Sequence, residues 1–214
     1  MAFGYHGKIL HIDLASGTFK LEEPPDEFYR KYLGGSAVGT YYALKYTPPK
    51  VDPLSPENTL TLAAGVVTGA PIPGQSRITA TAKSPLTGAI GDSQSGGFFP
   101  AEFKFAGFGA LVIHGKSPQP VYIWIHGGEY ELMPAEHLMG RDTLAVETIL
   151  KEELDDPKIQ ILQTGIAGEN GVRFAALIIM ANRANGRTGM GAVMGSKNLK
   201  AVVVRGKIKP EIYD

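Results

Sequence analysis

The sequence of 214 residues contains no cysteine, no excess of either charge and no long apolar run. The absence of cysteine excludes disulfides, thiolate zinc sites, iron–sulfur ligation and cysteine nucleophiles within this chain. Basic and acidic side chains number 21 each, so no basic stripe can neutralise a nucleic-acid backbone, and we expect no nucleic-acid partner. The longest apolar run, Ala175–Ala181, is too short to cross a bilayer, and residues 1–7 lack the pattern of a signal peptide. We therefore expect a cytoplasmic protein without a membrane partner.

Glycine is the residue in excess, with 27 copies beside 15 prolines, while 43% of the chain is hydrophobic. This content of apolar residues suffices for a large core, and the length fits one large domain or two small ones. Glycine in such amounts points to many tight turns or to close approaches of the backbone.

The two halves of the sequence show the same order of predicted elements. Each half begins with a strand hairpin, continues with a helical stretch and returns with three further apolar strands. The pattern predicts an α+β fold, a β-rich duplicated domain of two intertwined hairpin/helix/strand repeats, with mixed sheets and a few short helices. We expect a single domain over 1–214, with repeats at about 1–116 and 117–210; chance similarity of glycine-rich β segments is the alternative. The expected elements are strands at 8–14, 18–21, 59–65, 77–82, 110–115, 121–126, 130–133, 161–165, 172–176 and 201–206, and helices at 26–33, from an N-cap at Ser36 to Tyr46, and at 142–154.

The match between the halves rests on three anchors. Thr61–Gly65 corresponds to Ile161–Gly165, Ser76–Ala80 to Val172–Ala176, and Ala110–Lys116 to Ala201–Lys207. The second anchor places an arginine at the start of a strand in both copies. Deletions in the loops of the second half account for the shrinking offset.

Two glycine-rich loops, Gly91–Gly97 and Asn182–Gly195, occupy corresponding places, and each precedes a short predicted helix. Such loops let backbone N–H groups approach a phosphate or pyrophosphate, and Arg183 and Arg187 would add bidentate donors. Alternatively, the glycines serve turns and the arginines are solvated. The spacing GxGxxxG at Gly189–Gly195 does not fit a dinucleotide fold.

Other side chains give no sign of catalysis. The five histidines have no ligand spacing, and no serine sits in a nucleophile elbow, so we expect no catalytic residue in this chain. The phenylalanines between 98 and 108 are interpreted as core.

At these loops the sequence resembles the N-terminal domain of the aldehyde ferredoxin oxidoreductase family, tungsten enzymes that oxidise aldehydes to carboxylic acids. The resemblance covers nearly the whole chain and includes several long, compositionally unusual motifs. The matching segments are Val51–Asn58, Lys83–Gly88, Ser95–Gly97, Glu102–Gly107, Ala167–Asn170 and Gly191–Ala201.

The resemblance implies a base on which a bis-pterin cofactor of tungsten or molybdenum sits. Arg77 resembles the arginine between a pterin and the iron–sulfur cluster. In the family, backbone carbonyls at the positions of Gln94 and Ala184 help to hold a magnesium ion that bridges the two pterin phosphates. Relatives commonly carry asparagine at the position of Gln94 and glycine at that of Thr188. Gln94, Ser95 and Gly96 fall on the first pterin loop, and Arg183, Ala184, Gly186 and Arg187 on the second.

The resemblance also implies parts that this chain lacks. In the family, the cysteines of the 4Fe-4S cluster and the acid–base residues lie in two helical domains that follow this one. We expect those domains of the same enzyme as the partner of this chain, ferredoxin as electron acceptor and a small aldehyde as substrate; a homodimer is compatible with it. By itself the chain is expected to be inactive.

Two other classes of function remain open at this point. A stand-alone carrier of a phosphate-bearing ligand would need a closed surface where the family packs its helical domains. A purely structural interaction domain would show no affinity for anions. An exposed apolar patch around the glycine-rich loops would favour the cofactor base over the stand-alone carrier.

Overall fold

Two six-stranded sheets, each built wholly from one half of the chain, form the computed structural model, which describes residues 3–213. The strand orders are β2-β1-β6-β3-β4-β5 and β8-β7-β12-β9-β10-β11, which are the same order with six added to every number. In both sheets one pair, β1/β6 or β7/β12, is parallel and every other pair is antiparallel. The predicted α+β fold and its duplication are confirmed.

The strands of the first sheet are β1 (Ile9–Asp13), β2 (Thr18–Glu22), β3 (Leu60–Ala64), β4 (Ile78–Lys83), β5 (Ile90–Ser95) and β6 (Ala110–His114). Those of the second are β7 (Val121–His126), β8 (Glu129–Pro134), β9 (Gln160–Thr164), β10 (Leu177–Ile179), β11 (Arg183–Asn185) and β12 (Leu199–Arg205). The helices are α1 (Asp26–Tyr32), α2 (Gly35–Tyr46), α3 (Phe99–Phe105), α4 (Thr143–Glu153), α5 (Ile166–Glu169) and α6 (Met190–Ser196), with a 3-10 turn at Glu136–Leu138.

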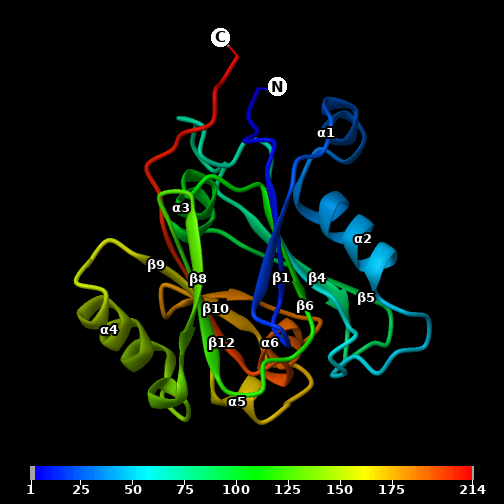
Figure 1. Ribbon diagram of the computed structural model, residues 1–214, viewed down its shortest axis with the longest axis vertical. Helices are drawn as coiled ribbons and strands as arrows, with labels where there is room; N and C mark the ends of the chain where they lie inside the picture. The colour runs from blue at the N-terminus through cyan, green and yellow to red at the C-terminus, as the bar shows by residue number, and fades with distance from the viewer. Residues whose placement is uncertain (1–2, 214) are drawn as a thin grey trace.

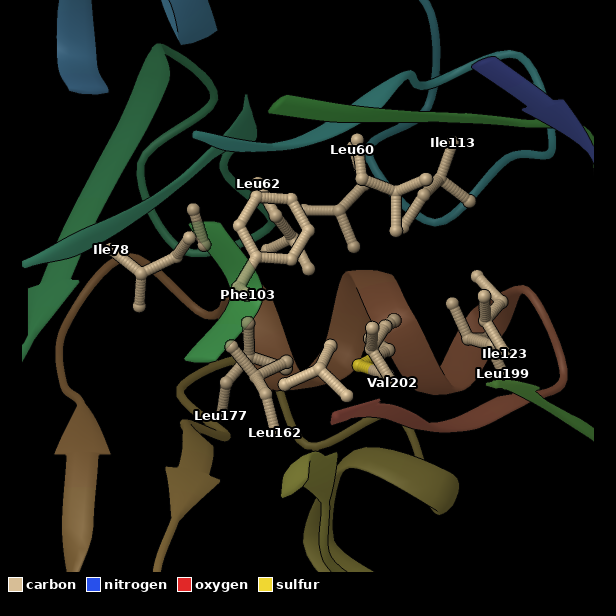
Figure 2. Packing of buried hydrophobic residues seen from close by; sticks show 14 of the residues in the cluster. Leu60, Leu62, Ile78, Phe103, Ile113, Ile123, Leu162, Leu177, Leu199 and Val202 are labelled. Carbon is tan, nitrogen blue, oxygen red and sulfur yellow. The ribbon is translucent and has the colours of Figure 1, made fainter. Parts of the chain in front are cut away.

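The core lies between the two sheets, where helices α3 and α6 are packed. Helix α3 belongs to the first half yet contacts β9 and β12 of the second sheet, and α6 of the second half contacts β4 of the first. Figure 2 shows Phe103 of α3 between Leu62 and Leu162, which come from different sheets. Because apolar side chains of both sheets bury one another here, neither half encloses a complete core without the other.

Helices α2 and α4 cover the outer faces of the two sheets (Figure 1). Helix α4 follows the sequence closely: the Asp142 carboxylate accepts hydrogen bonds from the backbone N–H groups of Leu144 and Ala145, so it caps the helix. Val146 and Leu150 are fully buried against the second sheet. No helix among residues 3–213 is both long and apolar enough to cross a membrane.

Five local predictions are wrong. The second glycine-rich loop, predicted over Asn182–Gly195, contains strand β11 at Arg183–Asn185 and most of helix α6 at Met190–Ser196. Helix α2 begins at Gly35, so Ser36 lies in its first turn and does not cap it. Residues 90–95 form an edge strand, where the sequence predicts a loop. The strand was missed because its buried positions carry glycine and serine, where strands usually carry apolar residues. A Cβ atom at Gly91 would lie 2.6 Å from Met190 Cε, so only a very small residue fits beneath α6. Phe98 is 68% exposed and does not join the core.

The fifth error concerns residues 172–176, which form a turn, with strand β10 beginning only at Leu177. Their carbonyl groups serve helix α6: the N–H of Gly191 donates to Ala175 O at 2.9 Å. The strand ladders place Ala64 of β3 and Thr164 of β9 at equivalent positions in the two halves. The antiparallel partner of Ala64 is Ile78 and that of Thr164 is Leu177, so Ile78 and Leu177 are equivalent too. Arg173 is therefore not the structural counterpart of Arg77.

Candidate functional site

The free edges of the two sheets meet at strands β5 and β11. Each is the last strand of its sheet, and the two are in contact across the molecule. An edge strand leaves alternate backbone N–H and C=O groups without a ladder partner, so this junction offers unpaired polar backbone. The ladder register places Gln94 opposite Thr79 and Ala184 opposite Ile178, which makes Gln94 and Ala184 equivalent residues of the two halves.

A cavity of about 680 Å³ opens over this junction. Six of the eight site residues predicted from the sequence line it. It draws on the loop before β4, on the end of β5 and on the segment around β11, so both halves contribute. The predicted residues among its walls are Arg77, Gln94, Ser95, Gly96, Arg183 and Ala184, and the others are Gly74, Gln75, Ser76, Gly97, Phe98, Met180 and Asn182.

The loop that carries Arg77 is fixed from below by two buried polar side chains. The Thr68 hydroxyl donates to Arg77 O at 3.0 Å and accepts from its N–H at 3.2 Å. The Lys104 ammonium donates to Gly65 O at 3.0 Å and Val66 O at 2.6 Å, and burial lowers the pKa of Lys104 to about 8. The backbone around Arg77 is thus held in place, while its guanidinium is exposed at the cavity.

Two arginines, one from each half, flank the glycines that follow β5. A Cβ atom at Gly96 would collide with Arg77 Nη1, and one at Gly97 would lie 2.9 Å from Met180 Sδ and 3.2 Å from Arg183 Cδ. Gly97 also has φ of +106°, which side chains rarely adopt. Both the positive φ and the lack of space for a Cβ atom therefore require glycine at position 97. Because Gly97 has no side chain, Arg183 can lie against it at the cavity.

The side chain of Gln94 turns away from the junction toward helix α2. Its amide Nε2 donates to the Ser36 hydroxyl at 3.0 Å. Ser95, in contrast, is buried, and its hydroxyl lies 2.5 Å from Oδ1 of Asn185, its equivalent in the second half. At the junction, Gln94 consequently contributes its backbone and not its side chain.

Gly186 and Arg187 lie beyond the cavity on the same segment. Both are exposed, and nothing lies within 4 Å of where a Cβ atom of Gly186 would be. Arg187 and Thr188 have φ of +68° and +54°, so two side chains adopt the left-handed conformation in succession. This turn is attached to the first half by Ser84, whose hydroxyl donates to Thr188 O at 2.7 Å.

Two of the segments that resemble the family, 51–58 and 83–88, hold the loops around the site in place. The fully buried side chain of Asn58 donates to Pro53 O at 2.6 Å and to Lys83 O at 2.9 Å, and it accepts from Lys83 N at 3.0 Å. Asn58 thereby joins segments 51–58 and 83–88. Through Ser84, the second of these segments then supports the loop at Thr188.

The charges at the cavity favour an anionic ligand. Neither Arg77 nor Arg183 forms an ion pair with any carboxylate of residues 3–213. Within the same residues, no group of three histidine, aspartate or glutamate side chains is placed to hold a metal ion. A cation at this junction would therefore be bound by backbone carbonyls and by the ligand's own oxygens, which are the donors that magnesium prefers.

Sequence reasoning missed Asn185, Ser76 and Met180. Asn185 lies within the second glycine-rich loop but was not singled out, because its contacts are with the other half of the chain. Aligning the halves by strand register pairs it with Ser95 and would have identified it. Met180 and Ser76 have no comparable signal in the sequence.

These features define a duplicated β domain in which two equivalent edge strands and two arginines line one cavity. The chain belongs to the aldehyde ferredoxin oxidoreductase family: the profile of the family's N-terminal domain matches residues 9–206. It is 50% identical over 212 residues to the tungsten-containing aldehyde ferredoxin oxidoreductase of Pyrococcus abyssi and 44% identical to that of Pyrococcus furiosus. Both alignments cover 99% of this chain and 35% of the relative.

Two further relatives have other activities. The WOR-like subunit of the aliphatic sulfonate oxidoreductase of Pyrococcus furiosus is 36% identical over 228 residues, across 99% of this chain and 36% of that protein. Among solved structures, the active-site complex BamBC of benzoyl coenzyme A reductase in complex with 1,5-dienoyl-CoA superposes with a TM-score of 0.94 at 37% identity. That superposition covers 98% of this chain and 32% of the other. The chain thus spans about a third of the length of its relatives.

Proposed function

We propose that the cavity at the β5/β11 junction holds a bis-pterin cofactor of tungsten or molybdenum, and that this chain is the base on which that cofactor rests. The observation that carries the proposal is the pairing of equivalent edge strands beneath one cavity lined by cationic groups. Two similar pterins, each ending in a phosphate, match a cradle whose halves are related by duplication. The tungsten-containing relatives supply the class of cofactor.

The residues at the cavity fit such a ligand. Arg77 and Arg183 would each donate charge-assisted hydrogen bonds to the pterin or its phosphate. Ser95 and Gly96 would line the first pterin loop, with Gly186 and Arg187 on the second loop outside the cavity wall. The carbonyls of Gln94 and Ala184 would help to hold a magnesium ion between the two phosphates, because they occupy equivalent edge positions.

When bound, the cofactor supplies the two-electron redox chemistry that none of this chain's side chains provides. The role of this chain is to bind and orient it. The activity of the whole protein, which we propose to be oxidation of an aldehyde to a carboxylic acid, also needs an iron–sulfur cluster and an electron acceptor such as ferredoxin. The cluster would belong to the two-thirds of the relatives' length that this chain does not span, and the electron acceptor would be a separate protein.

Exposed apolar side chains near the cavity support this proposal over a stand-alone carrier. Phe98 lines the cavity and is 68% exposed, while Ile72 and Val67, in the loop that leads to Arg77, are 52% and 49% exposed. Apolar side chains at the rim of a polar site indicate that another protein layer covers it.

The test is the metal and pterin content of the chain, expressed alone and within the full-length protein that its gene encodes. We expect tungsten or molybdenum with about two pterins per metal in the full-length protein and little of either in the isolated chain. Fluorescence after oxidation measures the pterin, and mass spectrometry measures the metal. Full-length protein without pterin would contradict the proposal and favour a carrier of another phosphate-bearing ligand.

A further inference from the structure

Asn185 joins the two halves of the cradle directly. The ladders place Ile78 opposite Ser95 in the first sheet and Leu177 opposite Asn185 in the second, and Ile78 and Leu177 are equivalent. Ser95 and Asn185 are therefore equivalent residues, one from each half. Their side chains touch, with Ser95 Oγ 2.5 Å from Asn185 Oδ1.

The amide group of Asn185 also reaches the backbone of the first sheet. Its Nδ2 donates to Ser93 O at 2.9 Å and to Ile78 O at 3.4 Å. Because both amide hydrogens point to carbonyls, Oδ1 is left as acceptor and the Ser95 hydroxyl donates to it. One side chain of β11 thus bonds to β5 twice and to β4 once.

This group of contacts is buried: Asn185 is 0% exposed and Ser95 is 6% exposed. A buried amide whose donors and acceptor are all satisfied is costly to disturb, because each lost partner leaves a polar group without water. The contacts therefore favour one separation of β5 and β11 over any other.

We propose that Asn185 is a positioning residue that sets the distance between strands β5 and β11. The neighbours of the contact pair are Gln94 and Ala184, the two residues whose carbonyls meet a bridging cation under the proposed function. By fixing the two edge strands, Asn185 fixes the gap between those carbonyls. The statement about the strands stands on the contacts alone; the statement about the cation rests on the proposed function.

Hydrogen exchange of the purified chain, followed by mass spectrometry, tests the first statement. We expect Asn185→Ala to accelerate amide exchange in residues 90–95 and 183–185 about tenfold, with little change in strands β7 and β12. The matched control is Asn170→Ala. Asn170 is exposed at the end of α5, and its backbone N–H donates to Ile166 O in that helix instead of to either edge strand. Should Asn185→Ala prevent folding, Ser95→Ala removes only the bond between the two side chains and should give a smaller acceleration in the same segments.

The duplication provides a rescue that a merely structural asparagine would not allow. In the double variant Ser95→Asn with Asn185→Ser, an amide at position 95 faces the equivalent carbonyls of Arg183 and Leu177. We expect the exchange rates to return to within about threefold of the wild type, whereas Asn185→Ser alone stays about tenfold faster. Unchanged exchange in Asn185→Ala and Ser95→Ala, or a swap no better than the single variant, would overturn the proposal.

A calorimetric titration separates this inference from the proposed function. The probe is inorganic pyrophosphate with magnesium, titrated into the full-length protein after its cofactor has been removed. Asn185→Ala should raise the dissociation constant of the probe about tenfold relative to both the wild type and Asn170→Ala. If the exchange results are as expected while the wild type binds no magnesium pyrophosphate, Asn185 positions the strands and the phosphate cradle is refuted. If the wild type binds the probe and exchange is unchanged in the variants, the cradle stands and the role of Asn185 is refuted.

Discussion

His11 and His114 lie on the neighbouring strands β1 and β6 with their rings parallel, and Nδ1 of His11 is 3.2 Å from Nε2 of His114. His11 Nε2 is 2.6 Å from Glu22 Oε2, so it donates there and leaves Nδ1 as the acceptor of a proton on His114. The Thr59 hydroxyl lies 3.5 Å from His114 Nδ1 at the inner end. Two histidines in this arrangement are both neutral.

This pair predicts an acid-sensitive fold. Burial, then His11, then Lys197 lower the pKa of His114 from 6.5 to about 4, and burial also lowers the pKa of His11. Lys20 and Glu22 of β2, Tyr42, Lys45 and Tyr46 of α2, and Asp13 of β1 also face the pair. Because the unfolded chain binds the proton more readily, the free energy of unfolding should fall by about 2 kcal/mol as the pH drops from 6.5 to 4.

Urea denaturation at several pH values measures this dependence. His114→Gln should reduce the slope between these pH values, because glutamine does not titrate. His137→Gln is the control, since His137 is more exposed and contacts Glu153 at the surface. Equal slopes in the wild type and His114→Gln would contradict the assignment.

The two arginines of the second loop should differ in their effect on ligand binding. Arg183 lines the cavity, whereas Arg187 does not. Under the proposed function, Arg183→Ala should weaken binding of magnesium pyrophosphate by about tenfold to a hundredfold, the value of one or two charge-assisted hydrogen bonds. Arg187→Ala should weaken it several-fold less. Calorimetry on both variants checks the order, and a larger loss in Arg187→Ala would mean that the ligand lies outside this cavity.

Gly97 should tolerate alanine poorly. Gly97→Ala adds a methyl group against Met180 and Arg183 to the cost of a positive φ, so we expect a loss of about 2–3 kcal/mol in the free energy of unfolding. Gly88→Ala is the matched control, because Gly88 has φ of +74° with nothing within 4 Å. It should lose only about 1 kcal/mol. Equal losses in the two variants would show that the contacts with Met180 and Arg183 are not tight.

Thr188→Gly should stabilise the chain. A β-branched residue at φ of +54° is strained, and glycine removes that strain at a smaller entropic cost. We expect thermal denaturation of the variant to show a gain of about 1 kcal/mol in the free energy of unfolding. Thr87→Gly, at a position without positive φ, should instead reduce stability. A loss in Thr188→Gly comparable to that control would indicate that the threonine side chain stabilises the loop.

The sequence predicted the elements whose apolar periodicity is strong. Helix α4, with its cap at Asp142, and the inner strands β3, β6, β9 and β12 lie within one or two residues of their predicted bounds. Their side chains face a core, so burial leaves a clear pattern in the residue types. Strand β5 has no such pattern, because its buried positions carry glycine and serine, and Met190 of helix α6 lies against Gly91.

The candidate site was predictable in its loops but not in its long-range contacts. Arg183 was named from its glycine-rich loop, and Arg77 and Gln94 from the resemblance; the structure brings all three to one cavity. The pairs Ser95–Asn185 and His11–His114 join residues 90 or more positions apart. No local pattern encodes such contacts, since they depend on how two sheets come together.

Equivalent positions at the junction carry different residues, which is possible only when the two halves are parts of one chain. In a symmetric dimer of one half, the residue in place of Ser95 would face its own copy, so a serine could not meet an asparagine there. A covalent link between the halves lets each copy mutate alone. The position that Gln94 holds in one half is held by Ala184 in the other, and the two sides of the cavity are no longer interchangeable. Two chemically identical ligand groups bound across it would experience different surroundings, so the protein can treat one differently from the other.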